Sequence, residues 1–127
     1  MPRVLVVEDD PGILNIVVQV LEDEGFEVES SYGDGRDALQ KIEHRRPDVV
    51  LLDYQLPGMD GVQIAREIRG RGDLTDVKIV GMTAAGRMRR VCEEMQADGC
   101  LGKPFDLDDL IAVVAQEEHR GHRGIDG

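Results

Sequence analysis

Apolar runs alternate with amphipathic stretches five times along this chain of 127 residues. The runs are short and rich in Val, Ile and Leu, and they predict strands at residues 4–7, 27–31, 49–52, 77–82 and 100–102. Strands that alternate with helices of about three turns require right-handed crossovers, which produce a parallel sheet with helices on both faces. The expected fold is therefore a doubly wound α/β domain built on a five-stranded parallel sheet.

The stretches between the runs carry the start and stop signals of helices. Four of the expected helices begin after an aspartate that can cap them, namely Asp10, Asp34, Asp60 and Asp106. Pro11, directly after Asp10, is typical of a first helical position. Glycines are expected to end three of the helices, and these are Gly25, Gly70 and Gly99.

Length and composition favour a single domain. A hydrophobic content of 41% is enough for one ordinary core. The pattern holds for residues 1–118, whereas residues 119–127 are expected to form a flexible tail or the stub of a linker. His119 and His122 stand in that segment at a spacing that could hold a metal, but a solvated tail is favoured because nothing nearby would order them.

Several classes of function are disfavoured by the same composition. The chain has no apolar run long enough to cross a bilayer and no signal peptide, which favours a soluble cytoplasmic protein without membrane insertion. Cys92 and Cys100 lack a paired C-x-x-C spacing, so we expect two reduced, buried thiols and no zinc site or disulfide. A net charge of −11 would repel a polyphosphate backbone, so direct binding of nucleic acid by this domain is not expected.

Polar residues gather where the predicted strands end. In an open α/β sheet, ligands bind outside the carboxyl ends of the strands. The residues that follow the first, third, fourth and fifth strands are, in order, Glu8, Asp9 and Asp10; Asp53; Thr83 and Ala84; and Lys103 and Pro104. Each alone has a simpler interpretation, such as a helix cap for Asp10 or a surface position for Lys103. Their combination indicates a site.

Electrostatics decides what such a site needs. Glu8, Asp9 and Asp53 converge if the first and third strands are neighbours, and two carboxylates ~4 Å apart repel by about 4 kcal/mol at an effective dielectric near 20. A divalent cation relieves this repulsion, and an oxygen-only site with room for water and a phosphoryl oxygen suits Mg²⁺ better than Zn²⁺. Lys103 supplies further positive charge. The sequence therefore predicts a magnesium site.

A carboxylate in this position can also react. The oxygen of Asp53 is a competent nucleophile towards phosphorus and can form an acyl phosphate when a metal and Lys103 neutralise the transferring group. The hydroxyl of Thr83 and the backbone N–H of Ala84 are then expected to donate to the phosphoryl oxygens.

The matching motifs are VLVVEDD, LLDYQLPGMDG, the pair Thr83 and Ala84 thirty residues after Asp53, and KPF at residues 103–105. In this order and spacing they resemble the receiver domain of two-component response regulators, and the resemblance covers residues 3 to about 116. It implies a flavodoxin-like (βα)5 fold with strand order 2-1-3-4-5. It also implies a signalling switch rather than a turnover enzyme.

The resemblance further implies roles for individual residues in metal binding. Asp53 matches the phosphoacceptor. Asp9, Asp53 and the backbone carbonyl of Gln55 match the ligands of Mg²⁺, and Glu8 matches an acid that acts on the metal through water. Gln55 and Ala85 fall where the family tunes the lifetime of its acyl phosphate.

Other positions match the switch. Thr83 matches the switch hydroxyl, and Lys103 matches the lysine that pairs with the phosphoryl group. Pro104 matches a proline that follows a cis peptide bond. Cys100 stands where the family commonly has an aromatic residue that turns inward, so output is expected to depend on the fourth helix and the loop before it. Three arginines at the start of that helix form either a solvated patch or a docking surface, and they are Arg87, Arg89 and Arg90.

Partners follow from the resemblance too. The implied phosphodonor is a sensor histidine kinase or a histidine phosphotransfer protein, and the switching surface comprises the fourth helix, the fifth strand and the fifth helix. The output partner, or a missing output domain, is not identified by the sequence. The oligomeric state is open, with a phosphorylation-dependent dimer as one alternative.

Two other functions fit the architecture. A magnesium-dependent phosphatase with an aspartyl nucleophile usually has a second acid two residues after the first, where this chain has Gln55. A flavodoxin-like carrier of FMN needs a hydroxyl-rich phosphate loop after the first strand, where the segment EDDPG offers repulsion.

Overall fold

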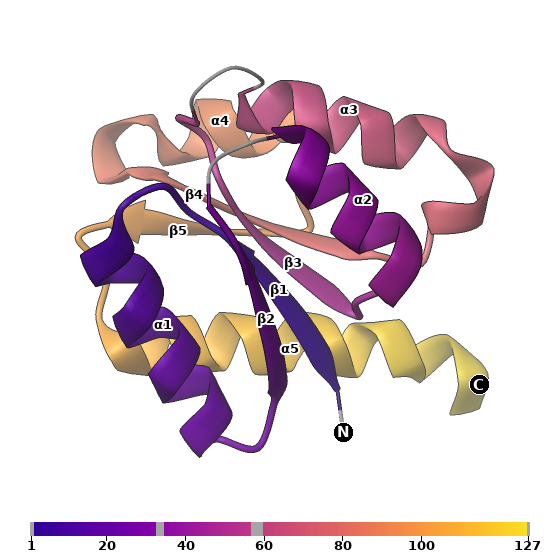
Figure 1. Ribbon diagram of the computed structural model, residues 1–127, viewed down its shortest axis with the longest axis horizontal. Coiled ribbons are helices and arrows are strands. Elements are labelled where there is room, and N and C mark those ends of the chain that lie inside the picture. Colours follow the sequence, from indigo (N-terminus) through magenta and orange to yellow (C-terminus); the bar gives the residue numbers. More distant parts are fainter. Residues whose placement is uncertain (1, 33–34, 57–59, 127) are drawn as a thin grey trace.

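Five parallel strands form a single sheet in the order β2-β1-β3-β4-β5 (Figure 1). The structure is a computed structural model that describes residues 2–32, 35–56 and 60–126, with side chains up to residue 119. The strands are β1 (Arg3–Val7), β2 (Glu27–Ser31), β3 (Val49–Asp53), β4 (Lys78–Ala84) and β5 (Gly99–Lys103). The predicted fold class and strand order are confirmed.

Helices cover both faces of the sheet, as Figure 1 shows. One face carries α1 (Pro11–Asp23) and α5 (Leu107–Asp126). The other face carries α2 (Gly35–Arg45), α3 (Gly61–Gly70) and α4 (Met88–Met95). Short 3-10 turns, η1 (Gly72–Leu74) and η2 (Ala85–Arg87), lead into β4 and α4 respectively.

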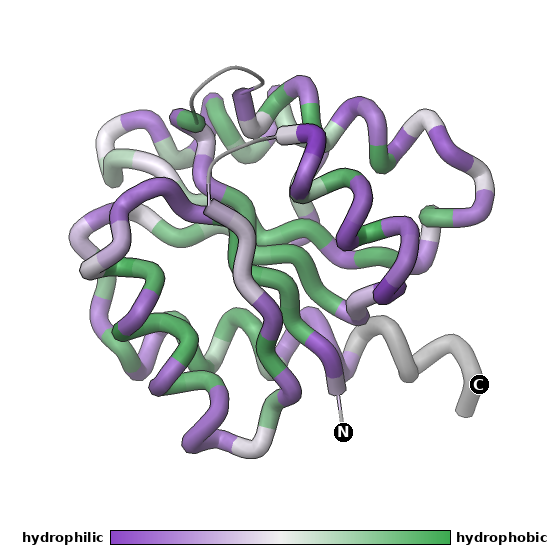
Figure 2. Tube along the Cα trace, viewed as in Figure 1, coloured by the Kyte–Doolittle hydropathy of each residue, from purple (hydrophilic) through white to green (hydrophobic). Residues whose placement is uncertain are grey.

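The core has two halves because successive side chains of a strand point to opposite faces. In β1, Val4 and Val6 pack towards α1 and α5, whereas Leu5 and Val7 pack towards α2, α3 and α4. Figure 2 shows the hydrophobic strands at the centre of the molecule. All five residues of β3 are buried, which accounts for its unbroken apolar run.

Two helix starts agree with the predicted caps. The side chain of Asp10 accepts hydrogen bonds from the backbone N–H groups of Gly12 and Ile13, and Pro11 is the first residue of α1. Asp60 and Gln63 form a reciprocal capping box at the start of α3. Another predicted cap, Asp34, lies outside the described residues.

The end of the fourth helix differs from the prediction. Helix α4 ends at Met95, and Gln96 adopts a left-handed conformation with φ of 51°. Asp98 fixes the turn that follows, because its carboxylate accepts hydrogen bonds from the backbone N–H of Ile79 at 2.8 Å and from Arg69 at 2.7 Å. The prediction of Gly99 as the helix stop was therefore wrong, and Gly99 is the first residue of β5.

The last helix is longer than its apolar stripe. Helix α5 continues to Asp126, so residues 119–126, which the sequence favoured as a tail or linker, have helical backbone. The domain boundary at residue 118 stays a prediction. Among the described residues, none of the helices combines the length and the apolar character needed to cross a membrane.

Candidate functional site

The register of the sheet brings the predicted residues to one edge. Val7 pairs with Leu52, Asp53 pairs with Met82, and Ala84 pairs with Lys103, so the chain leaves β1, β3, β4 and β5 on the same side. A cavity of about 500 Å³ opens there. It is lined by Glu8, Asp9, Asp10, Ile13, Asp53, Gln55, Thr83, Ala84, Arg87 and Lys103. Every residue predicted to ligate the metal or to contact the phosphoryl group thus lines one cavity, whereas Pro104 and Ala85 do not.

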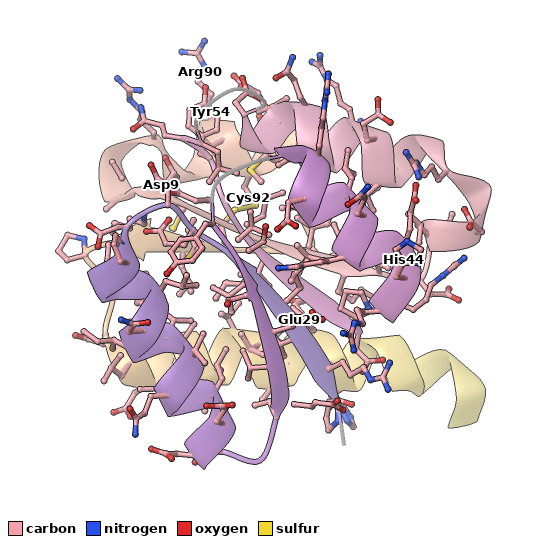
Figure 3. The ribbon with its side chains drawn as sticks, in the orientation of Figure 1. Asp9, Glu29, His44, Tyr54, Arg90 and Cys92 are labelled. Carbon is pink, nitrogen blue, oxygen red and sulfur yellow. A yellow bond between two sulfur atoms is a disulfide. The ribbon has the colours of Figure 1, made fainter. Side chains whose placement is uncertain are left out.

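Three acids form the floor and rim of this cavity. Glu8 is fully buried and Asp53 is 5% exposed, whereas Asp9 is exposed in the loop between β1 and α1 (Figure 3). One carboxylate oxygen from each of the three lies within 4.8 Å of the others. No other cluster of three or more potential metal ligands occurs in the part of the chain that the structure describes.

Lys103 bridges two of these acids. Its Nζ donates a hydrogen bond to Oε1 of Glu8 at 2.8 Å and lies 3.3 Å from Oδ2 of Asp53. The Lys103–Pro104 peptide bond is cis, as the sequence resemblance implied. Gly102 lets β5 approach η2 closely, because a Cβ atom at this position would lie 2.8 Å from Cα of Ala85. The ammonium group is therefore held inside the cavity.

The charged groups in the cavity change each other's pKa values. Burial, followed by the neighbouring Asp53, raises the pKa of Glu8 to about 8, although the hydrogen bond from Lys103 acts in the opposite direction. Burial acts to lower the pKa of Lys103, but its hydrogen bond to Glu8 and the charge of Asp53 outweigh this and raise it. These shifts favour the protonated form of Glu8 and the charged form of Lys103.

The donor set fits a hard divalent cation. Oε2 of Glu8 is buried and has no hydrogen-bond partner among the described atoms, which costs free energy unless another group satisfies it. The carboxylates of Asp9 and Asp53 offer oxygen ligands, and Gln55 lines the same cavity. Oxygen-only sites of this kind suit Mg²⁺, which keeps several waters. The residues present therefore match the predicted cofactor.

Both ends of the segment after Asp53 are anchored. The backbone N–H of Tyr54 donates to the carbonyl of Met82 at 2.9 Å, and the N–H of Gly61 donates to the carbonyl of Tyr54 at 2.9 Å. A Cβ atom at position 61 would lie 2.9 Å from Cα of Tyr54 and would also collide with the carbonyl oxygen of Asp53. The first residue of α3 thus has to be glycine for the helix to pack against the backbone of Asp53.

Two features went unpredicted. Arg87 lines the cavity, although the sequence analysis placed it only in a basic patch; its position four residues after Thr83 was the available signal. Cys92 and Cys100 form a disulfide, so the expectation of two reduced thiols was wrong. Helix α4 and strand β5 lie side by side, which brings the two Cα atoms to 6.0 Å (Cys92 is labelled in Figure 3).

Comparison with known proteins shows which family this arrangement belongs to. The family model described as the response regulator receiver domain matches residues 4–115. The chain belongs to the response regulator receiver family. A receiver domain is the phosphorylatable signalling module of two-component systems, and both the strand order and the acidic cavity of this chain agree with that assignment.

Named relatives support the assignment. The receiver is 40% identical over 114 residues to the DNA-binding response regulator MtrA of Mycolicibacterium smegmatis, covering 88% of this chain and 48% of MtrA. It is 32% identical over 116 residues to the DNA-binding dual master transcriptional regulator RpaA of Synechocystis, covering 90% and 48%. The chain spans about half the length of these relatives.

Solved structures agree as well. The chemotaxis response regulator CheY4 of Vibrio cholerae superposes on this receiver with a TM-score of 0.84 and 30% sequence identity. The match covers 92% of this chain and 98% of CheY4.

Proposed function

We propose that Asp53 of this receiver accepts a phosphoryl group from a phosphohistidine on a sensor histidine kinase or a histidine phosphotransfer protein, with Mg²⁺ as cofactor. The observation that carries the proposal is the position of the Asp53 carboxylate, 3.3 Å from Nζ of Lys103 and clustered with Glu8 and Asp9 in an open cavity. A buried carboxylate next to a fixed cation is suited to attack on an anionic phosphoryl group.

In the proposed reaction, a carboxylate oxygen of Asp53 attacks phosphorus while the bond between phosphorus and the donor imidazole breaks. The products are an acyl phosphate and a free histidine on the donor. Asp9, Asp53 and the backbone carbonyl of Gln55 would hold Mg²⁺, with Glu8 acting through water. When bound, Mg²⁺ supplies positive charge that neutralises the transferring group. Lys103 orients the carboxylate of Asp53 and offsets the added negative charge.

The switch depends on contacts that form only after phosphorylation. Thr83, which is 5% exposed, and the backbone N–H of Ala84 line the cavity and would donate to the new phosphoryl oxygens. Shifting a two-state equilibrium from about 1:99 to 99:1 takes about 5.5 kcal/mol, and a few charge-assisted hydrogen bonds of about 1.5–3 kcal/mol each can provide that. Helix α4 follows Thr83 through η2, so the α4-β5-α5 surface would respond.

An apolar groove beside the cavity supports a protein as the donor. The groove has a volume of about 550 Å³, and Ile13 and Lys103 line both it and the acidic cavity. Ile16 is 55% exposed and Leu107 is 43% exposed at this groove, so the groove presents apolar side chains to a partner. We propose that apolar side chains of the donor protein pack here while its phosphohistidine enters the cavity.

The remaining parts of the function are proposals of the same kind. Residues 1–118 act as the receiver, as a signalling switch rather than a turnover enzyme, in the cytoplasm. The output partner is not assigned, and a dimer formed on phosphorylation remains a prediction.

The test is incubation with acetyl phosphate and Mg²⁺, followed by intact mass measurement. The wild-type chain is expected to gain one phosphoryl group, and the gain should disappear when Mg²⁺ is chelated. Asp53→Asn should show no adduct, whereas Asp60→Asn, at the cap of α3, should be phosphorylated like the wild type. An adduct of equal yield on Asp53→Asn would overturn the proposal.

A further inference from the structure

The disulfide between Cys92 and Cys100 joins two elements of the proposed switching surface. Cys92 belongs to α4 and Cys100 to β5, and their Cα atoms are 6.0 Å apart, a usual separation for a disulfide. Both residues are only partly buried. Cys100 also lines a groove of about 470 Å³ between the start of α4, β5 and α5. A reagent in solution can therefore approach the bond.

The disulfide lies close to the part of β5 that faces the acidic cavity. Cys100 pairs with Gly81 of β4, and two residues further along Gly102 pairs with Thr83. Gly81 faces both this sulfur and the core of α4, because a Cβ atom there would lie 3.4 Å from Sγ of Cys100 and 3.1 Å from Sδ of Met95. The covalent link thus ties α4, which follows Thr83 in the chain, to the strand that carries Lys103.

We propose that Cys92 and Cys100 are a reversible redox modification site that opposes the phosphorylation-dependent rearrangement of α4. The inference rests on the proposed function of Asp53. The bond joins α4 to β5 and so holds α4 in the arrangement that the structure shows. A covalent link within a moving surface restricts the other arrangement. Reduction releases α4 from β5, and the receiver then responds fully to phosphorylation.

The chemistry is thiol–disulfide exchange. In the oxidising direction, one cysteine thiolate attacks a small disulfide such as oxidised glutathione, forming a mixed disulfide and releasing one thiol. The second cysteine thiolate then displaces the other thiol and closes the bond. Two electrons pass from the cysteines to the external disulfide, and the two cysteine protons end on the released thiols. A dithiol reductant of the thioredoxin class reverses both steps.

Thermodynamic linkage makes the proposal measurable from both sides. If the bond weakens the binding of a phosphoryl group or its mimic by some factor, the mimic must favour reduction of the bond by the same factor. Coupling between two sites on one domain is typically about fivefold or more. This reciprocity distinguishes a coupled redox site from a disulfide that only staples the fold.

The experiment uses the full chain, Mg²⁺ and beryllofluoride, a non-covalent mimic of the phosphoryl group. The protein is prepared oxidised with oxidised glutathione or reduced with dithiothreitol, and thiol alkylation with mass measurement verifies each state. The dissociation constant of beryllofluoride is expected to be at least about fivefold higher for the oxidised protein. In a glutathione redox buffer, beryllofluoride should raise the ratio of reduced to oxidised protein by the same factor.

Variants provide the controls. Cys92→Ser and Cys100→Ser cannot form the bond, so each should bind beryllofluoride with one affinity under both redox conditions. Asp53→Asn should still form the disulfide, but beryllofluoride should not change its ratio of reduced to oxidised protein. Equal affinities of the oxidised and reduced wild type, or thiols that stay alkylatable after oxidation, overturn this inference alone. Absence of beryllofluoride binding in both states overturns the inference together with the proposed function.

Discussion

Glu8 is a buried acid whose pKa is strongly raised, so its protonation is expected to change when a metal binds. It is fully buried, one oxygen accepts from Lys103, and the other has no partner in the described part of the structure. Its pKa is raised from 4.5 to about 8, with burial as the main cause and Asp53 as the next. Burial and Asp53 therefore favour the protonated carboxyl of Glu8, whereas a nearby divalent cation would favour the ionised form.

This residue gives the protein a pH-dependent stability. A raised pKa in the folded state means that the contribution of Glu8 is fully present below pH 4.5 and is lost as the pH rises towards about 8. In the presence of a chelator, the free energy of unfolding of the wild type should fall relative to that of Glu8→Gln by up to a few kcal/mol across this window. Urea unfolding at a series of pH values measures the difference.

Added Mg²⁺ should reduce the loss in the wild type, because the metal favours the ionised carboxylate. Curves for the wild type and Glu8→Gln that run parallel through the whole pH window would show that Glu8 does not hold the proton.

The junction of β3 and α3 positions Asp53, the proposed phosphoacceptor, and it depends on one glycine. Gly61→Ala places a methyl group against the backbone of Asp53 and Tyr54, which cannot move aside as a flexible side chain can. We expect a loss of about 1–3 kcal/mol in the free energy of unfolding and weaker Mg²⁺ binding. Chemical denaturation and titration calorimetry measure the two effects.

Gly70→Ala is the matched control in the same helix. Apart from its chain neighbours and the backbone of its own helix, no described atom lies within 4 Å of a Cβ placed at Gly70, so alanine should be neutral or stabilise by up to about 1 kcal/mol. If Gly61→Ala and Gly70→Ala change the free energy of unfolding and Mg²⁺ binding equally, the close packing of α3 on Asp53 does not explain the glycine at position 61.

Sequence patterns predict these elements where the signal is local. The apolar run of β3 and the caps Asp10 and Asp60 can be recognised from a few neighbouring residues. The parallel sheet then brings the strand ends to one edge. The end of α4 and the Cys92–Cys100 bond were missed. Both depend on how a helix of eight residues sits on β4 and β5, and periodicity in so short a segment does not encode that position.

The same limit applies to the site. Convergence of the acids followed from topology, whereas the place of Arg87 on the cavity wall depends on the path of η2 after Thr83. The bridging geometry of Lys103 required the three-dimensional register of β1, β3 and β5.

The acidic cavity and the apolar groove lie side by side on the domain, whose net charge is −11. Docking of a donor protein on the groove can be separated from the chemistry at Asp53. Ile16→Asp should slow transfer from a phosphorylated histidine phosphotransfer protein by about tenfold or more, because it removes an apolar side chain that the donor would cover in the complex. Phosphorylation by acetyl phosphate should change by less than about twofold, since this small donor does not need the groove.

Met88→Asp is the control for that experiment, because Met88 is an exposed hydrophobic residue on α4 that does not line the groove. It should leave the protein donor's rate unchanged. An equal effect of both substitutions, or none from Ile16→Asp, would remove the groove from the docking surface.

The central claim is that phosphorus becomes attached to the carboxylate of Asp53. Borohydride reduces an acyl phosphate to an alcohol, so treatment of the phosphorylated receiver followed by peptide mass spectrometry identifies the modified residue directly. The account predicts conversion of residue 53 to homoserine, only when Mg²⁺ and a phosphodonor are both present. Homoserine at residue 9, or a phosphorylated protein without homoserine at residue 53, would contradict it.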